Sequence, residues 1–110
     1  MGTTPEGLQF LDPWHQSDQE LHEELEREMS PRHQLYGIKA RAIALRQDCD
    51  DVLFELLGER APAALAVVHL TWSGKEDRDP RFPWVELYDS FTDWTVRCML
   101  PDAENWNLSN

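Results

Sequence analysis

Residues 65–72 read LAVVHLTW, and this is the strongest strand pattern in the chain. Both alternating faces of this stretch are apolar, and several of its residues are β-branched. That combination is typical of a strand that is covered on both sides of a sheet. We therefore expect residues 65–72 to form a central strand, and the fold depends on what flanks it.

Two more strand patterns precede this stretch and form a hairpin. Residues 38–46 (IKARAIALR) become apolar on both faces in their second half, and residues 52–57 (VLFELL) continue the pattern. Between them, residues 47–51 are rich in aspartate, which favours a turn because its side chain bonds to nearby backbone groups.

A fourth strand is expected on the other side of the central one. Residues 73–83 (SGKEDRDPRFP) are charged and contain glycine and proline, so they indicate a loop. Residues 84–88 (WVELY) then alternate in polarity, which predicts a short strand.

A first helix is expected to begin at Ser17. Ser17 and Glu20 have the spacing of a capping box, in which each side chain bonds the backbone N–H of the other residue. Pro31 ends the helix near residue 30, because the residue before a proline avoids helical geometry. The apolar stripe of this helix consists of Leu21, Leu25 and Met29.

A second helix is expected after the last strand. Ser90 and Asp93 resemble another N-terminal cap, and Pro101 is expected to stop the helix. Its apolar face consists of Phe91, Trp94 and Cys98. Residues 102–110 then form a tail with little pattern.

These elements predict a single α+β domain over residues 1–110. Residues 1–16 contain two prolines and two glycines, and we expect an extended N-terminal segment there. The order α-β-β-β-β-α with short connections predicts a meander-like antiparallel sheet of four strands. An N-terminal and a C-terminal helix are expected to pack together on one face of that sheet.

The charge of the chain limits its partners. Its 21 acidic and 10 basic residues give a formal net charge of −11. Nucleic acids and anionic membranes are normally bound by clustered Lys and Arg, so neither is expected as a direct partner. A basic protein is favoured instead, because opposite charges speed encounter. The alternative is that the charge serves solubility alone.

The sequence predicts a cytoplasmic protein. Its N-terminus lacks the basic and apolar layout of a signal peptide, and no apolar run approaches membrane-spanning length. Cys49 and Cys98 are then expected to be reduced thiols. Acidic neighbours disfavour the reactive thiolate of Cys49, and Cys98 has the pattern of a core residue.

No metal, cofactor or catalytic residue is predicted. His22 and Glu26 are four residues apart, which is the minimum for a metal site and is also typical of a surface pair. The acidic turn at residues 48–51 lacks the glycine and distal glutamate of a calcium loop. It therefore predicts carboxylates that face water.

His69 allows two interpretations. It lies within the apolar central strand, where a buried histidine needs partners for both ring nitrogens. In the first interpretation it is a core residue bonded to a backbone carbonyl or a tyrosine. In the second it lines a ligand pocket with Trp72 and with Tyr36 or Tyr88 nearby.

The loop after the central strand is the best candidate for a contact surface. It presents aromatic and basic side chains, which dominate interface energetics. The candidates are Trp72, Lys75, Arg78 and Trp84, with Arg81 and Phe82 beside them. A nucleotide site is excluded, because the phosphate-loop pattern GxxxxGK[ST] is absent.

Two stretches carry a resemblance to known proteins. They are LYGIKARAIALRQDCDDVLFEL at residues 35–56 and LAVVHLTWSGKED at residues 65–77. The central half of the chain thus resembles a family of small, acidic, single-domain bacterial proteins with no assigned activity. Its size, charge and architecture are also similar to those of immunity proteins that neutralise bacterial toxins. This likeness implies binding and no catalytic residue.

The sequence therefore predicts a protein-binding, inhibitor-like module. Its contacts would be the aromatic and basic loop, together with acidic helix residues such as Glu23 and Glu24. That helix could also imitate a row of phosphates. The alternative is a small ligand-binding domain or enzyme centred on His69. The oligomeric state is left open.

Overall fold

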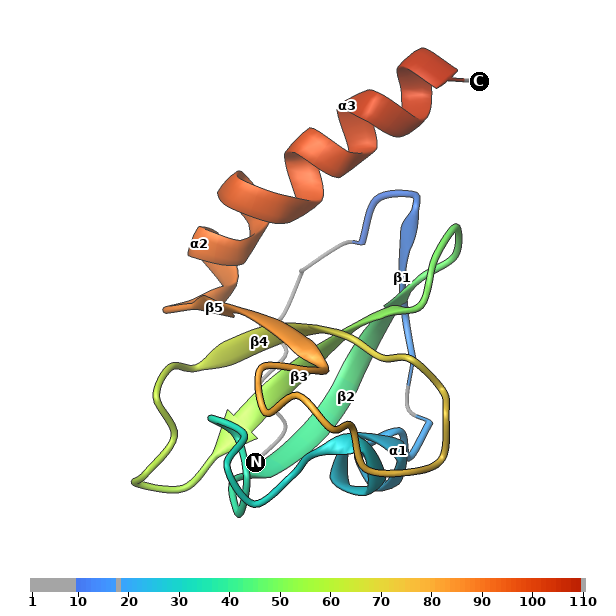
Figure 1. The fold of residues 1–110 in the computed structure, drawn as a ribbon. Coiled ribbons are helices and arrows are strands. Elements are labelled where there is room, and N and C mark those ends of the chain that lie inside the picture. The colour runs from blue at the N-terminus through green and yellow to red at the C-terminus, as the bar shows by residue number, and fades with distance from the viewer. Residues whose placement is uncertain (1–9, 18, 110) are drawn as a thin grey trace.

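The computed structural model describes residues 10–17 and 19–109 of the chain. The strands and a short helix, α1, come first along the chain, and a long helical segment follows the last strand (Figure 1). The elements are β1 (Trp14–Gln16), α1 (His22–Glu28), β2 (Lys39–Arg46), β3 (Asp51–Leu57), β4 (Leu65–His69), β5 (Trp84–Tyr88), α2 (Phe91–Trp94), the π-helical turn η1 (Thr95–Met99) and α3 (Leu100–Ser109).

The strands form one antiparallel sheet in the order β1-β2-β3-β4-β5. The predicted α+β class, antiparallel pairing and meander order are confirmed. The predicted number of four strands is wrong, because Trp14 pairs with Arg46 and adds β1 as a fifth. Three residues next to a proline are too few to show an alternating pattern, although Trp14 is buried.

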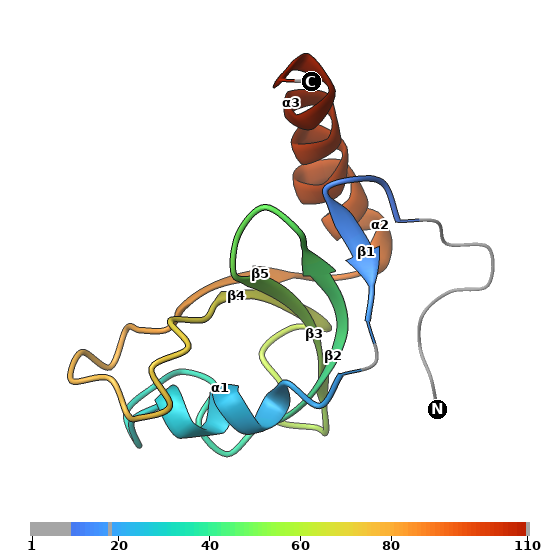
Figure 2. The ribbon, with the colours of Figure 1, turned by 90° about the vertical axis from the view of Figure 1, so that its right-hand side faces the viewer.

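Each face of the sheet carries its own apolar core, because β3 and β4 are apolar on both sides. The first core contains Leu21, Leu25, Met29, Leu35, Ala42, Val52, Phe54, Leu56, Ala66, Val68, Leu70 and Val85. The second core contains Trp14, Ile43, Ala44, Leu53, Leu65, Val67, Tyr88, Trp94, Cys98 and Met99. The helices therefore lie on opposite faces (Figure 2), and the prediction that they share one face is wrong.

Helix α1 begins later than predicted. Its N-cap is Leu21, without a side-chain cap, and the hydroxyl of Ser17 accepts a hydrogen bond from the backbone N–H of Gln19 (3.2 Å). The N–H of Ser17 bonds the carbonyl of Ile43, so Ser17 still belongs to the sheet edge. The predicted capping box with Glu20 is therefore wrong, whereas the predicted apolar stripe is buried in the first core.

The C-terminal helical segment runs to Ser109, so Pro101 does not end it and residues 102–109 are not a tail without structure. The π turn directly before Pro101 explains this. The N–H of Leu100 reaches back to the carbonyl of Thr95. A wider turn relieves the contact between a proline ring and the preceding helical carbonyls.

This helical segment packs on the sheet as far as Ala103, and its last residues do not. The hydroxyl of Ser90 caps it by accepting from the N–H of Asp93 (3.0 Å), as predicted. Trp94 and Ala103 are buried, whereas Leu108 is 85% exposed. Figure 1 shows α3 extending beyond the sheet.

Candidate functional site

The long connection between β4 and β5 is held against α1 by a buried carboxylate. Glu28 is fully buried, and its two oxygens accept hydrogen bonds from the backbone N–H groups of Thr71 (2.9 Å) and Trp72 (2.8 Å). Trp72 has a φ of 59°, in the left-handed region. Backbone turned in this way can direct N–H groups to one anion. Here the anion is the chain's own glutamate.

Glu24 adds a second anchor for the same loop. One of its oxygens accepts from the N–H of Gly74 (3.0 Å) and the other from Arg27 (3.1 Å). Gly74 has a φ of 73°, which favours glycine there. Glu24 therefore points inward and is nearly buried, whereas Glu23 is exposed. The two glutamates proposed as contacts do not form one acidic surface.

The carboxyl groups of Glu24 and Glu28 also bond to each other. Burial raises the pKa of Glu28, and the hydrogen bond to Glu24 raises it further. The same bond lowers the pKa of Glu24. Ionisation is therefore less favourable at Glu28 than at Glu24, although the backbone N–H groups of Thr71 and Trp72 stabilise the charged form of Glu28.

The far end of the loop is fixed by a buried histidine. The Nδ1 atom of His33 accepts from the N–H of Leu35 (3.0 Å), so its Nε2 carries the proton and donates to the carbonyl of Pro83 (2.8 Å). Both ends of the loop are thus bonded to the segment from α1 to residue 35. Figure 1 shows the loop passing beside α1.

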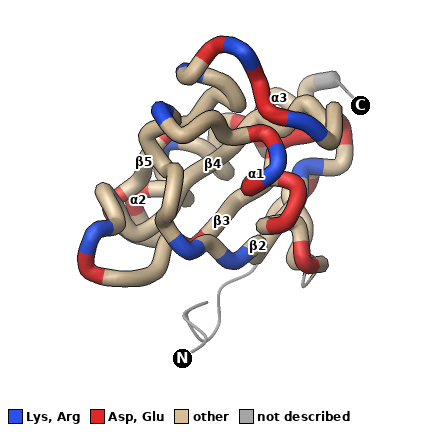
Figure 3. Tube along the Cα trace, turned by 60° about the horizontal axis from the view of Figure 1, so that its bottom comes forward, with Lys and Arg blue, Asp and Glu red and all other residues tan. Residues whose placement is uncertain are grey.

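This anchored loop exposes the residues that the sequence predicted as contacts. We call the exposed side chains of Trp72, Lys75, Arg78, Phe82 and Trp84 the loop surface. Trp72 is 44% exposed and Trp84 is 48% exposed. The rings of Phe82 and Trp84 lie 6.2 Å apart. Basic and acidic residues alternate along the loop (Figure 3).

His69 lies on the sheet face between two carboxylates. Its Nδ1 is 2.5 Å from Asp51 and its Nε2 is 3.8 Å from Glu86, and its side chain is 38% exposed. Trp84 is its cross-strand neighbour on β5. His69 is thus neither a fully buried core residue nor bonded to a tyrosine. The sequence did not predict Asp51 as a partner, because Asp51 was assigned to the turn before β3.

The tyrosines do not form a pocket with His69. Tyr36 is exposed and lies beside a hollow lined by the end of α1 and the start of β2, whereas His69 faces the second core. Tyr88 shares the face of Glu86, but Arg97 covers its ring at 4.8 Å. The structure therefore brings together His69 and Trp84, but neither tyrosine with them.

Replacing Asp51 with asparagine is expected to lower the pKa of His69 in an NMR titration. The hydrogen bond to Asp51 raises that pKa most, and the charge of Glu86 adds less. Replacing Glu86 with glutamine is the matched control and should lower the pKa by a smaller amount. An equal or larger effect of Glu86→Gln would contradict this geometry.

The same pair makes stability depend on pH. Since the folded-state pKa of His69 is raised, its contribution is fully present below its ordinary value of about 6.5 and is lost as the pH rises through the raised value. The pair is partly exposed, so the contribution is at most about 1 kcal/mol. The difference in unfolding free energy between wild type and Asp51→Asn should therefore become smaller as the pH rises from about 6.5 through the raised pKa of His69.

A polar cluster beneath the C-terminal helix was not predicted. The side-chain N–H of Trp14 donates to Asp102 (2.9 Å), and Arg46 lies 3.3 Å from the same carboxylate. Cys98 contacts Asp102 at 3.5 Å. Burial raises the pKa of the Cys98 thiol to about 12, so the reactive thiolate is disfavoured. This cluster ties β1 to the helix and is structural.

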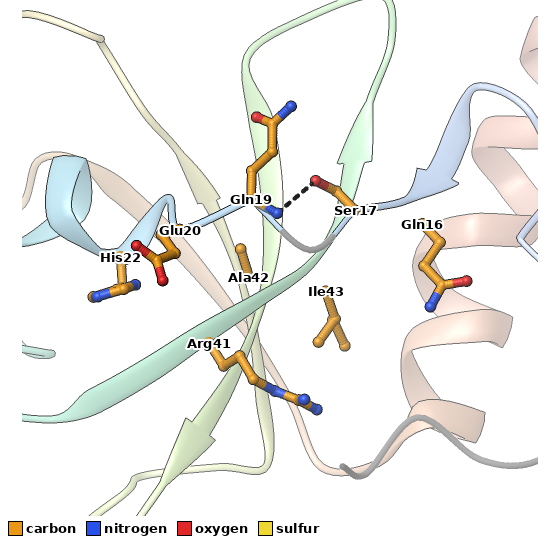
Figure 4. Close-up of a pocket in the computed structure, with 8 residues that line it drawn as sticks. All are labelled: Gln16, Ser17, Gln19, Glu20, His22, Arg41, Ala42 and Ile43. Carbon is orange, nitrogen blue, oxygen red and sulfur yellow. Dashed lines mark hydrogen bonds between the residues drawn. The ribbon is translucent and has the colours of Figure 1, made fainter.

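A hollow of about 310 Å³ lies between β1, β2 and the start of α1 (Figure 4). Figure 4 shows Glu20 and His22 at the α1 end and Gln16 at the β1 end. Ala42 and Ile43 of β2 also line it. Arg41 reaches this hollow as well, although its guanidinium pairs with Glu55 (3.0 Å). The hollow combines side chains of both charge signs and does not assemble a nucleophile with a base.

Residues 10–17 and 19–109 contain neither a metal-binding cluster nor a membrane-spanning helix. No group of three or more His, Cys, Asp and Glu side chains there could hold a metal ion. No helix in the same part of the chain is long and apolar enough to cross a membrane.

Comparisons with protein-family models, with curated proteins and with solved structures found no match to this chain. The resemblance to small acidic bacterial proteins and to immunity proteins therefore stays a prediction.

Proposed function

We propose that this chain is a protein-binding module of the inhibitor type, which neutralises a basic protein as toxin-immunity proteins do. The observation that carries the proposal is the anchored loop. Buried Glu28 fixes the backbone of Trp72 while the indole stays 44% exposed. A loop that is ordered before binding loses less entropy on association, and exposed tryptophans are frequent hot spots.

The charges around Trp84 support a basic partner. Glu86 and Asp51 lie on the same sheet face as Trp84, and the side chain of Glu86 is 52% exposed. A lysine or arginine of a partner could stack on the indole and pair with Glu86. The formal net charge of −11 favours the same partner at long range.

The alternative function, a small ligand-binding domain or enzyme centred on His69, has less support. Both ring nitrogens of His69 face carboxylates, and Tyr36 lies elsewhere. Mimicry of nucleic acid by α1 is also less supported, because Glu24 and Glu28 bond the loop instead of facing solvent. The proposed protein binding requires only side chains that are already exposed on the loop surface.

The first test is affinity capture from lysate of the native cells, at low and at high salt, with the captured proteins identified by mass spectrometry. We expect one basic protein that is recovered at low salt and reduced at high salt, because charge pairs are screened. Recovery of no specific protein at either salt would contradict the proposed function.

Replacing Trp72 or Trp84 with alanine is expected to weaken binding of that captured protein about thirtyfold or more each, as for hot-spot residues. Both residues are about half exposed and lie outside the two apolar cores, so the fold should be retained. Leu108→Ala is the matched control, because Leu108 is 85% exposed on α3, away from the loop surface. Calorimetry with the purified partner measures the change. Equal affinities of the wild type and the three variants would contradict the proposal that the loop surface binds the partner.

A further inference from the structure

Strand β5 is an open edge of the sheet. It is the last strand in the order β1-β2-β3-β4-β5, and within residues 10–17 and 19–109 it pairs with β4 alone. One edge of an antiparallel strand bonds its neighbour, so the other edge of β5 presents its N–H and C=O groups outward. Figure 1 shows β5 at the margin of the sheet with no strand beyond it.

The two edges of the sheet differ in length. Strand β1 has three residues and directly follows Pro13, features that protect an edge from pairing. Strand β5 has five residues, of which Trp84 and Glu86 are exposed. Edge strands of this length are templates to which an extended segment of another protein can add.

The side chains of β5 specify what could pair with it. Trp84 and Glu86 point to the face of the second core, where Tyr88 is buried. Val85 and Leu87 point to the first core. An added strand would place its residues about 5 Å from those of β5 on each face. Basic residues would therefore suit the face of Glu86, and apolar residues the other face.

We propose that β5 binds an extended, basic segment of a partner protein as a sixth strand, with lysine or arginine opposite Glu86 and apolar residues beside Val85 and Leu87. The inference rests on the proposed function and names how the basic partner is held. Glu86 also argues against a second copy of this chain. Antiparallel self-pairing centred on the strand would place two Glu86 side chains opposite each other, which is unfavourable.

The test uses the full chain and a seven-residue, end-blocked peptide that alternates valine with lysine. We expect backbone NMR shifts and amide protection from hydrogen exchange in residues 84–88 on titration. A peptide with the same lysines and with proline in place of valine cannot form the ladder. It should bind at least tenfold more weakly.

Two variants locate the contact. Glu86→Lys should weaken peptide binding at least tenfold. Glu104→Lys changes the net charge equally at an exposed position on α3 and should change peptide binding less than twofold. Equal binding of the proline peptide, or equal effects of both variants, would overturn the inference.

The outcome separates the inference from the proposed function. A captured partner that depends on Trp72 and Trp84 but gives no protection in residues 84–88 would overturn the inference and leave the proposed function standing. Capture of no partner would overturn the proposed function. The peptide titration tests strand addition at β5 independently of that result.

Discussion

Replacing Glu28 with alanine is expected to lower the free energy of unfolding by about 3 kcal/mol. The substitution removes the acceptor for the N–H groups of Thr71 and Trp72 and leaves a space where a buried side chain was. Hydrogen bonds to a charged group contribute roughly 1.5–3 kcal/mol each, and buried donors without partners are costly. The unfavourable burial of the carboxylate offsets part of this sum. Urea denaturation followed by circular dichroism measures the change.

Two further variants make this result specific. Glu23→Ala lies on the exposed side of the same helix and should change stability by less than about 0.5 kcal/mol. Glu28→Gln keeps one carbonyl acceptor but faces the second N–H with an amide donor, so its loss should be intermediate. If Glu28→Ala were as stable as Glu23→Ala, the carboxylate would not hold the loop.

The second large effect is expected at Trp94. Its ring is fully buried and makes edge contacts with Trp14 (5.3 Å between centroids) and Phe10 (5.8 Å). Replacing Trp94 with alanine should lower the free energy of unfolding by about 4 kcal/mol, as for other buried large aromatics. The cause is lost burial plus the cavity left in the second core. The same denaturation experiment applies, with the slope checked for two-state behaviour.

Trp94→Phe should lose much less stability than Trp94→Ala. The indole N–H of Trp94 is buried and has no hydrogen-bond partner among the residues that the structure describes. Removing it relieves a desolvated donor while most of the ring contacts remain. Val96→Ala is the control on the same helical segment, because Val96 is 58% exposed. A loss at Val96 comparable to that at Trp94 would show that the effect comes from the helix and not from the core.

The strands could be predicted because their patterns are local. The apolar stretch at residues 65–72 does contain β4, but the strand stops at His69, since the N–H groups of Thr71 and Trp72 bond Glu28 instead of a neighbouring strand. Strand β1 was missed because three residues carry no measurable period. Its place depends on the burial of Trp14, a tertiary contact.

The candidate site was predictable in part for the same reason. The exposure of Trp72 follows from the polar, breaker-rich loop, and that of Trp84 follows from the alternating polarity of β5. The inward turn of Glu24 and Glu28 does not, because a run of glutamates on a helix normally faces water. The partners of Glu28 are 43 and 44 residues away in sequence, and no local sequence pattern predicts such a contact. The pairing of Asp51 with His69 likewise needs the register of β3 and β4.

The two cores have different consequences for the order of folding. Most of the first core comes from residues 21–85, so those contacts can form before the C-terminal helix has been synthesised. Closing the second core requires Trp14 to meet Trp94 and Asp102, the last of which is 88 residues away in sequence. Loops of this length are slow to close. During synthesis, the second face of the sheet therefore stays open to solvent and to chaperones until α3 leaves the ribosome.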